Sequence, residues 1–163
     1  MSKEYIISPR AQKAMMNELS RFPDTETGGV LLGYSEGQKG VSILEATDGG
    51  YEDTLHEPFS FQYDSQYVAH MSMVLSELYT PPLDIVGVWH KHNSTSFVPF
   101  SRADEKIHEQ LLWQNSHPCF SILFEKLEKS QPGREMYQMR LFELTGADPV
   151  EIRSEVVYCQ PCL

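Results

Sequence analysis

The sequence has few cysteines and no long hydrophobic run. Only three of its 163 residues are cysteines, Cys119, Cys159 and Cys162, and this small, odd number argues against a disulfide framework. No apolar run approaches the roughly 18–20 residues that a membrane-spanning helix requires. Residues 1–16 also lack the apolar core of a signal peptide. These features predict a cytoplasmic protein with no membrane partner.

Basic residues are also scarce. Lysine and arginine total 13 against 23 aspartates and glutamates, which gives a formal net charge of −10 at pH 7. Such a surface repels phosphate backbones, so nucleic acid is not an expected partner. Hydrophobic residues make up 40% of the chain and charged residues 22%, values typical of a folded globular protein. We expect one domain over residues 1–158, followed by a flexible tail at 159–163.

Apolar periodicity and turn residues predict a mixture of strands and helices. The predicted strands cover residues 4–8, 28–36, 41–47, 59–63, 85–92, 119–128, 134–144 and 150–158. The predicted helices lie within residues 8–22, 64–80 and 101–116. The segment from Asp48 to Phe59 reads as a loop. Because strands and helices do not alternate regularly, the pattern favours an α+β fold with a mixed sheet flanked by helices.

Two histidines and an aspartate form the most informative group of residues. His90 and His92 end a predicted strand, so both imidazoles project from the same face while Lys91 points away. Asp104 lies at the start of the next predicted helix, and the connecting loop can return it toward that face. Two histidines and one carboxylate leave a fourth position open, which is the composition of a catalytic zinc site. The alternative is structural, because Ser101 and Asp104 also fit a helix capping box.

Glu26 is a candidate for the acid–base chemistry that such a site needs. It directly precedes the apolar segment "TGGVLLG". A hydrolytic zinc site requires a nearby carboxylate that takes a proton from water and delivers it to the leaving group. The alternative interpretation is a solvated glutamate in a turn.

These segments together resemble the JAMM metalloprotease family, also called the JAB/MPN domain. In that family a glutamate precedes a Gly-Gly strand, a later strand ends in His-x-His, and Ser-x-x-Asp opens the next helix. The matching residues are Glu26 before "GGVLLG", His90 and His92 in "GVWHKH", and Ser101 and Asp104 in "SRAD". The resemblance covers residues 6–124, which is most of the chain.

The resemblance implies a fold, a ligand set and individual roles. The implied fold is a curved mixed sheet packed with helices, in the α/β/α arrangement of zinc deaminases. The implied cofactor is one Zn²⁺ per chain, bound by His90, His92 and Asp104. Glu26 would be the general base and acid, and Ser101 would donate to the oxyanion of the tetrahedral intermediate.

The implied activity is that of a zinc metallopeptidase or isopeptidase. Its substrate would be an amide at the C-terminus of a ubiquitin-like or sulfur-carrier protein whose tail ends in Gly-Gly. Such a tail can bind in extended form along an exposed strand edge. The alternative is a non-catalytic JAB/MPN scaffold, because many family members have lost zinc and serve as binding modules. The complete ligand set of this sequence favours the enzyme.

Three features depart from the family pattern. Lys91 stands where a small residue is common, and Asn93 stands where proline is usual. The connector from Asn93 to Phe100 is one residue longer than the common pattern, which could shift Ser101 from the oxyanion position. Phe97 in this connector is a candidate substrate-binding residue. The alternative is that the aromatic residues pack, with Phe100 filling the core beside the helix N-terminus.

The remaining histidines and cysteines suggest structural roles. His108 is expected on a helix surface. Cys159 and Cys162 have Cys-x-x-Cys spacing, but a redox motif should open a helix and this pair ends the chain. A zinc nucleobase deaminase needs His-x-Glu and Pro-Cys-x-x-Cys, and neither motif occurs in the sequence.

Overall fold

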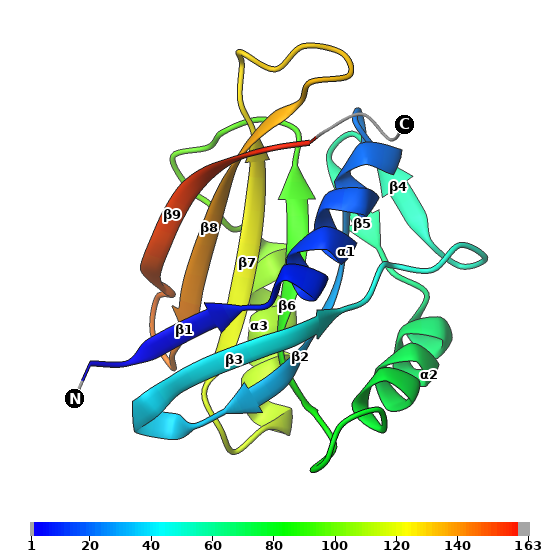
Figure 1. Cartoon of the computed structure of the whole chain (residues 1–163). Coiled ribbons are helices and arrows are strands. Elements are labelled where there is room, and N and C mark those ends of the chain that lie inside the picture. Colours follow the sequence, from blue (N-terminus) through cyan, green and yellow to red (C-terminus); the bar gives the residue numbers. More distant parts are fainter. Residues whose placement is uncertain (1, 160–163) are drawn as a thin grey trace.

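A computed structural model of the chain describes residues 2–159 (Figure 1). These residues form three α-helices, nine strands and one short 3-10 helix. The helices are α1 (Pro9–Arg21), α2 (Ser65–Ser76) and α3 (Arg102–Gln114), with the 3-10 helix at Gly37–Lys39. The strands are β1 (Glu4–Ile7), β2 (Thr27–Ser35), β3 (Gly40–Ala46), β4 (Leu55–Glu57), β5 (Ser60–Gln62), β6 (Asp84–His92), β7 (Cys119–Lys126), β8 (Met136–Leu144) and β9 (Val150–Tyr158).

Seven of these strands form one mixed sheet in the order β1-β3-β2-β6-β7-β8-β9. The β1–β3 and β6–β7 pairs are parallel, and the other neighbours are antiparallel. Figure 1 shows that the sheet curls strongly into a half-barrel. The predicted α+β class, with a curved mixed sheet flanked by helices, is confirmed.

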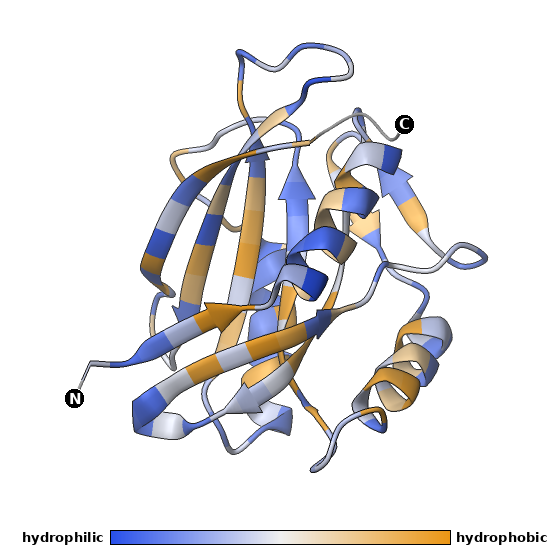
Figure 2. Ribbon diagram, in the orientation of Figure 1, coloured by the Kyte–Doolittle hydropathy of each residue, from blue (hydrophilic) through white to orange (hydrophobic). Residues whose placement is uncertain are grey.

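Helix α1 covers one face of the curled sheet. It begins at the N-cap Ser8, whose hydroxyl oxygen accepts the backbone N–H of Ala11, and Pro9 occupies the first turn. Its residues Ala11, Met15 and Leu19 are fully buried in the main hydrophobic core. The strands supply the rest of this core, and Figure 2 shows the hydrophobic residues along β3 and β7. Burial of this apolar stripe is what fixes α1 against the sheet.

Helices α2 and α3 cover the opposite face. Val68 of α2 packs with Val30 of β2, and Leu111 of α3 packs with Val88 of β6 and Cys119 of β7. Strand β6 is the middle strand of the sheet, so its two faces look toward α1 and toward α3 respectively. Successive side chains of β6 therefore enter two different environments.

The paired glycines of β2 permit close packing of the backbone around β6. A Cβ atom on Gly28 would lie 2.4 Å from the carbonyl oxygen of Trp89, and one on Gly29 would lie 2.0 Å from that of Thr47. Any side chain at these positions would collide with backbone atoms, so the approach requires glycine. This close packing places the residue just before β2, Glu26, beside the C-terminal end of β6.

One prediction about chain organisation, the loop at residues 48–59, was wrong in part. The segment read as a loop contains β4, which pairs antiparallel with β5 in a separate two-stranded sheet. Cys159, placed in the predicted tail, is buried in the main core and its N–H donates to the carbonyl of Glu135. The rest of that tail, residues 160–163, lies outside the described residues. Within residues 2–159 no helix is long and apolar enough to cross a membrane.

Candidate metal centre

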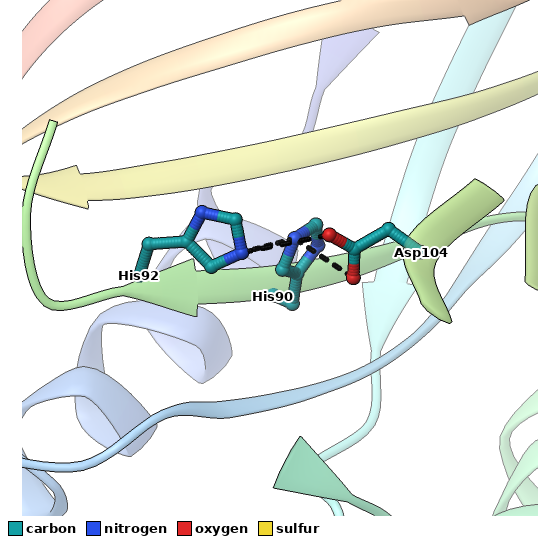
Figure 3. A group of neighbouring side chains, drawn as sticks. All are labelled: His90, His92 and Asp104. Carbon is teal, nitrogen blue, oxygen red and sulfur yellow. Dashed lines mark hydrogen bonds and ion pairs between the residues drawn. The ribbon is translucent and has the colours of Figure 1, made fainter. Parts of the chain in front are cut away.

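The side chains of His90, His92 and Asp104 meet between β6 and α3 (Figure 3). The two-residue period of β6 places both imidazoles on the face that looks toward α3. The Nε2 atoms of His90 and His92 lie 3.1 Å apart. Asp104, in the first turn of α3, places Oδ1 3.5 Å from His90 Nε2 and Oδ2 3.6 Å from His92 Nε2. The structure thus brings the three predicted ligands together.

These distances fit a small tetrahedral cation. Nitrogen and oxygen ligands about 2.0–2.1 Å from zinc lie roughly 3.3 Å from one another in a tetrahedron. The two Nε2 atoms lie 3.1 Å apart, and each lies 3.5 or 3.6 Å from a different oxygen of Asp104, which is close to this value. With one ligand atom taken from each residue, the three atoms lie within 4.8 Å of one another. All three residues are only partly buried, so an ion there would keep access to solvent. The three side chains could therefore hold a metal ion.

Asp104 belongs to both the candidate metal site and a helix cap. Its Oδ2 accepts the N–H of Ser101 at 2.7 Å, and the hydroxyl oxygen of Ser101 accepts the N–H of Asp104 at 3.2 Å. The predicted capping box is confirmed, and it coexists with the ligand group instead of replacing it. Because a hydroxyl that accepts a bond keeps its own O–H, Ser101 retains a donor beside the ligands.

The charge state of Asp104 suits metal binding. Burial alone would raise the pKa of this carboxyl, but hydrogen bonds from His90 and His92 hold its pKa well below the ordinary value. The carboxylate is therefore ionised at neutral pH. A metal ligand must be deprotonated, so no proton has to leave Asp104 on binding.

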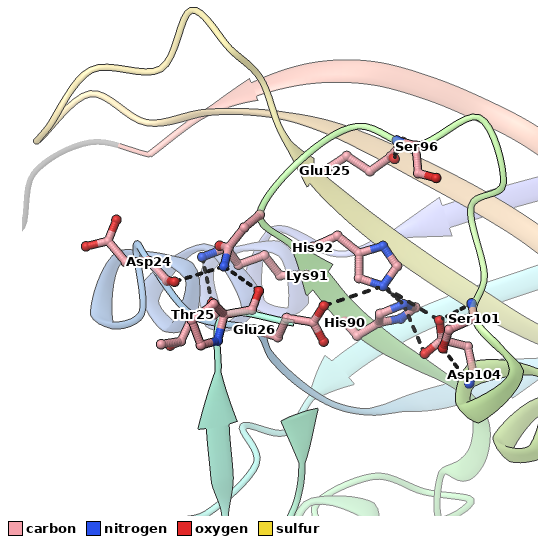
Figure 4. Close-up of polar contacts among 12 residues, drawn as sticks. Asp24, Thr25, Glu26, His90, Lys91, His92, Ser96, Ser101, Asp104 and Glu125 are labelled. Carbon is pink, nitrogen blue, oxygen red and sulfur yellow. Dashed lines mark hydrogen bonds and ion pairs between the residues drawn. The ribbon is translucent and has the colours of Figure 1, made fainter. Parts of the chain in front are cut away.

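Glu26 approaches the same group from the other side (Figure 4). It lies between α1 and β2, and its Oε1 is 4.0 Å from His92 Nε2. Burial raises the pKa of Glu26 to about 7, against the opposing effect of His92. Carboxyl groups in this range can both accept and return a proton near neutral pH. The alternative of a solvated turn glutamate does not fit this position.

A cavity of about 230 Å³ opens beside these side chains. Glu26, His90 and Asp104 line one part of it, and Phe61 and Ile107 are among the residues that line the remainder. The β4–β5 hairpin, which supplies Phe61, thus forms a wall of the site. Concave sites that combine a few converging polar groups with apolar walls are typical of ligand binding.

The connector between His92 and Asp104 is anchored in the core by Phe100. Phe100 is buried with Leu123 and Phe142, and its ring centroid lies 6.0 Å from that of His90. The core alternative for Phe100 is therefore confirmed. Phe97, by contrast, is fully exposed at the surface. The additional connector residue is accommodated without moving Asp104 away from the histidines.

Glu125 is a second anchor of this connector that sequence reasoning missed. It is buried in β7, where one carboxylate oxygen accepts the N–H of Ser96 at 2.9 Å. Its other oxygen pairs with Arg140 of β8, also at 2.9 Å. The available signal was a carboxylate that directly follows the largely apolar run of β7 at residues 119–124, because buried carboxylates require partners.

The prediction for His108 was wrong, because this residue is buried. Its Nε2 lies 3.2 Å from the hydroxyl of Ser121, and its ring packs edge-on against Phe100 at 4.7 Å between centroids. Burial lowers the pKa of His108 to about 4, so the imidazole is neutral near pH 7. It lies one helical turn after Asp104, and its contacts with Ser121 and Phe100 help to hold α3 against β7.

His56 also contacts the site and carried no signal in the sequence. The Nδ1 of His56 lies 3.0 Å from the carbonyl oxygen of Glu26, which can only accept, so Nδ1 carries the donated hydrogen. Its ring stacks on Phe22 with centroids 3.7 Å apart. A single histidine in a segment read as a loop gives no indication of such a contact.

Comparison with known proteins supports the fold and leaves the family open. No protein-family model matches the sequence, and no curated protein is similar to it in sequence. Its structure is similar to the solution structure of protein DSY2949 from Desulfitobacterium hafniense, with a TM-score of 0.56 and 14% sequence identity. The similarity covers 92% of this chain and 90% of that one. At 14% identity this similarity shows a shared fold only.

Proposed function

We propose that the protein is a zinc-dependent peptidase of the JAMM type that hydrolyses an amide bond. The observation that carries this proposal is the position of Glu26. Its carboxylate, on a segment separate from β6 and α3, lies 4.0 Å from His92 and lines the same cavity as His90 and Asp104. A structural cluster of two histidines and an aspartate would not need a second carboxylate at its open side.

Each residue then has a specific task in amide hydrolysis. A zinc ion held by His90, His92 and Asp104 would polarise the scissile carbonyl and lower the pKa of water. Glu26 takes a proton from the attacking water molecule and returns it to the departing amine, so that water and amide yield a carboxylic acid and an amine. The hydroxyl of Ser101 donates to the carbonyl oxygen as negative charge develops on it.

The proposed substrate follows from the resemblance to the family. It is the C-terminal tail of a ubiquitin-like or sulfur-carrier protein ending in Gly-Gly, joined through an amide to a leaving group. The competing function is a non-catalytic scaffold. A scaffold would have no use for an acid–base residue beside the ligand group, which is why we prefer the enzyme.

Hydrolysis of a peptide that ends in Gly-Gly linked to an aminocoumarin tests the proposal. We expect zinc-loaded protein to release the fluorescent amine and Glu26→Gln to lower turnover by about 100-fold or more, because glutamine cannot accept the proton. Zinc content should be equal in both proteins. Glu36→Gln, a change of an exposed glutamate in the turn after β2, is the matched control and should be fully active.

Three outcomes would contradict the proposal. Comparable turnover of the wild type and Glu26→Gln would remove Glu26 from the acid–base role. A zinc-loaded wild type that hydrolyses no Gly-Gly amide, whether peptide or protein fusion, would favour the scaffold. Loss of zinc in Glu26→Gln would instead make Glu26 a ligand.

A further inference from the structure

The segment that carries Glu26 is held by side chains from elsewhere in the chain. From Phe22 to Glu26, five consecutive backbone carbonyl oxygens each accept a hydrogen bond from a distant side chain. The donors are Lys91 for Phe22 and Thr25, Lys126 for Pro23, Asn93 for Asp24, and His56 for Glu26. Irregular backbone lacks the regular hydrogen bonds of a helix or a sheet, so these side-chain donors take their place.

Lys91 is the central donor of this arrangement. It lies on β6 between the two candidate ligands, and its side chain is fully buried on the opposite face of the sheet. Its ammonium donates to the carbonyl of Phe22 and, at 2.8 Å, to that of Thr25 (Figure 4). The ammonium also lies 5.7 Å from the ring centroid of Tyr137. Burying an ammonium costs free energy unless it is hydrogen-bonded. The two carbonyls therefore stabilise the buried Lys91, and Lys91 in turn holds the segment that carries them.

Asn93 extends the contact to the wall of the cavity. Its amide nitrogen donates to Asp24 at 2.9 Å and to Pro58, in the turn between β4 and β5, at 2.8 Å. On the other side of the segment, the N–H of Glu26 donates to the carbonyl of Glu57 at 2.7 Å. The Glu26 segment is thus tied both to the end of β6 and to the β4–β5 hairpin.

We propose that Lys91, assisted by Asn93, is a positioning residue that holds the Glu26 carboxylate at the metal centre. This inference rests on the proposed role of Glu26. It explains two of the three departures from the family pattern together, since Lys91 and Asn93 both bind the same segment. Strand β6 then sets the geometry of the whole site, with its histidines on one face and Lys91 on the other.

Two substitutions in the full chain test this inference. Lys91→Met approximately keeps the length of the side chain and removes its hydrogen-bond donors. Asn93→Ala removes the donors of the Asn93 amide. With zinc bound, we expect Lys91→Met to lower kcat on the Gly-Gly aminocoumarin peptide by about 10-fold or more, with KM and zinc affinity within about threefold of wild type. Asn93→Ala should shift kcat in the same direction by less. Lys129→Met, at an exposed lysine, is the control.

Hydrogen exchange gives a readout that does not depend on catalysis. The N–H of Glu26 should exchange at least about 10-fold faster in Lys91→Met, while amides in the centre of β6 keep their protection. If Lys91→Met does not fold, Asn93→Ala, at a partly exposed position, decides the question by the same measurement. Unchanged exchange at Glu26 in the folded variants would overturn the inference whether or not the protein hydrolyses peptides. Faster exchange with unchanged kcat would also overturn it.

Discussion

The candidate metal ligands and Glu26 are held in two different ways. His90, His92 and Asp104 belong to β6 and α3, whose backbone groups pair within the sheet ladder and the helix. Glu26 belongs to an irregular segment between α1 and β2 that depends on hydrogen bonds from Lys91 and other distant side chains. The candidate ligands are therefore fixed by regular secondary structure, and Glu26 is fixed by individual contacts.

This difference implies that metal affinity and hydrolysis can be changed separately. Substitutions in the ligand group should remove the metal, and activity should disappear as a consequence. Substitutions around the Glu26 segment should leave the metal in place and lower turnover.

The largest effect is expected for Asp104→Ala. Zinc affinity should fall by more than about 1,000-fold, because even hydrogen-bond partners of metal ligands commonly contribute 10–100-fold. Isothermal titration of zinc into metal-free protein measures the change. Glu105→Ala, at the exposed neighbouring residue of the same helical turn, should bind zinc like the wild type. Equal affinity of Asp104→Ala and wild type would leave Asp104 with its capping role alone.

An intermediate effect is expected for Ser101→Ala. Loss of the N-cap should reduce the free energy of unfolding by about 1 kcal/mol. Loss of the proposed donor to the oxyanion should lower kcat by about 100-fold with zinc affinity nearly unchanged. Ser8→Ala, which removes the N-cap of α1, should be similarly destabilised and fully active. If both variants keep their turnover, Ser101 acts as a cap and not as a donor to substrate.

The smallest effect on the fold is expected for Phe97→Ala. Its side chain is fully exposed, so the free energy of unfolding should change by less than about 0.5 kcal/mol. If Phe97 contacts substrate, KM should rise several-fold at constant zinc content. Phe100→Ala, in the same connector, should instead reduce the free energy of unfolding by about 3 kcal/mol because Phe100 is buried. An unchanged KM for Phe97→Ala would exclude this residue from substrate recognition.

Most of the fold could be predicted from local patterns in the sequence. The two-residue alternation of β6 predicts that His90 and His92 share a face, and Ser8 and Ser101 mark the helix starts where they occur. Strand β4 was missed because its sequence Leu-His-Glu has a single apolar residue and shows no alternation, whereas the equally short β5 lies in the alternating segment 59–63. Its pairing depends on the hairpin with β5, which is a tertiary feature.

The candidate metal ligands could be predicted from the sequence, but the residues that hold the Glu26 segment could not. The ligand residues lie close together in sequence, on a strand, a connector and a helix that follow one another. Lys91 and Thr25 are 66 residues apart, and their contact leaves no periodic trace. The alternation of β6 did predict that Lys91 points away from the histidines. Nothing in the sequence indicated which backbone groups it would meet on the other face.

The zinc content of the purified protein tests the central claim most directly. Protein prepared without chelator and analysed by mass spectrometry of metals should contain about one zinc per chain, as expected for a single three-ligand site. The His90→Ala/His92→Ala double variant, folded as judged by circular dichroism, should contain none. A wild-type protein that takes up no metal after zinc is supplied would contradict the account. Equal zinc in the wild type and the double variant would contradict it as well.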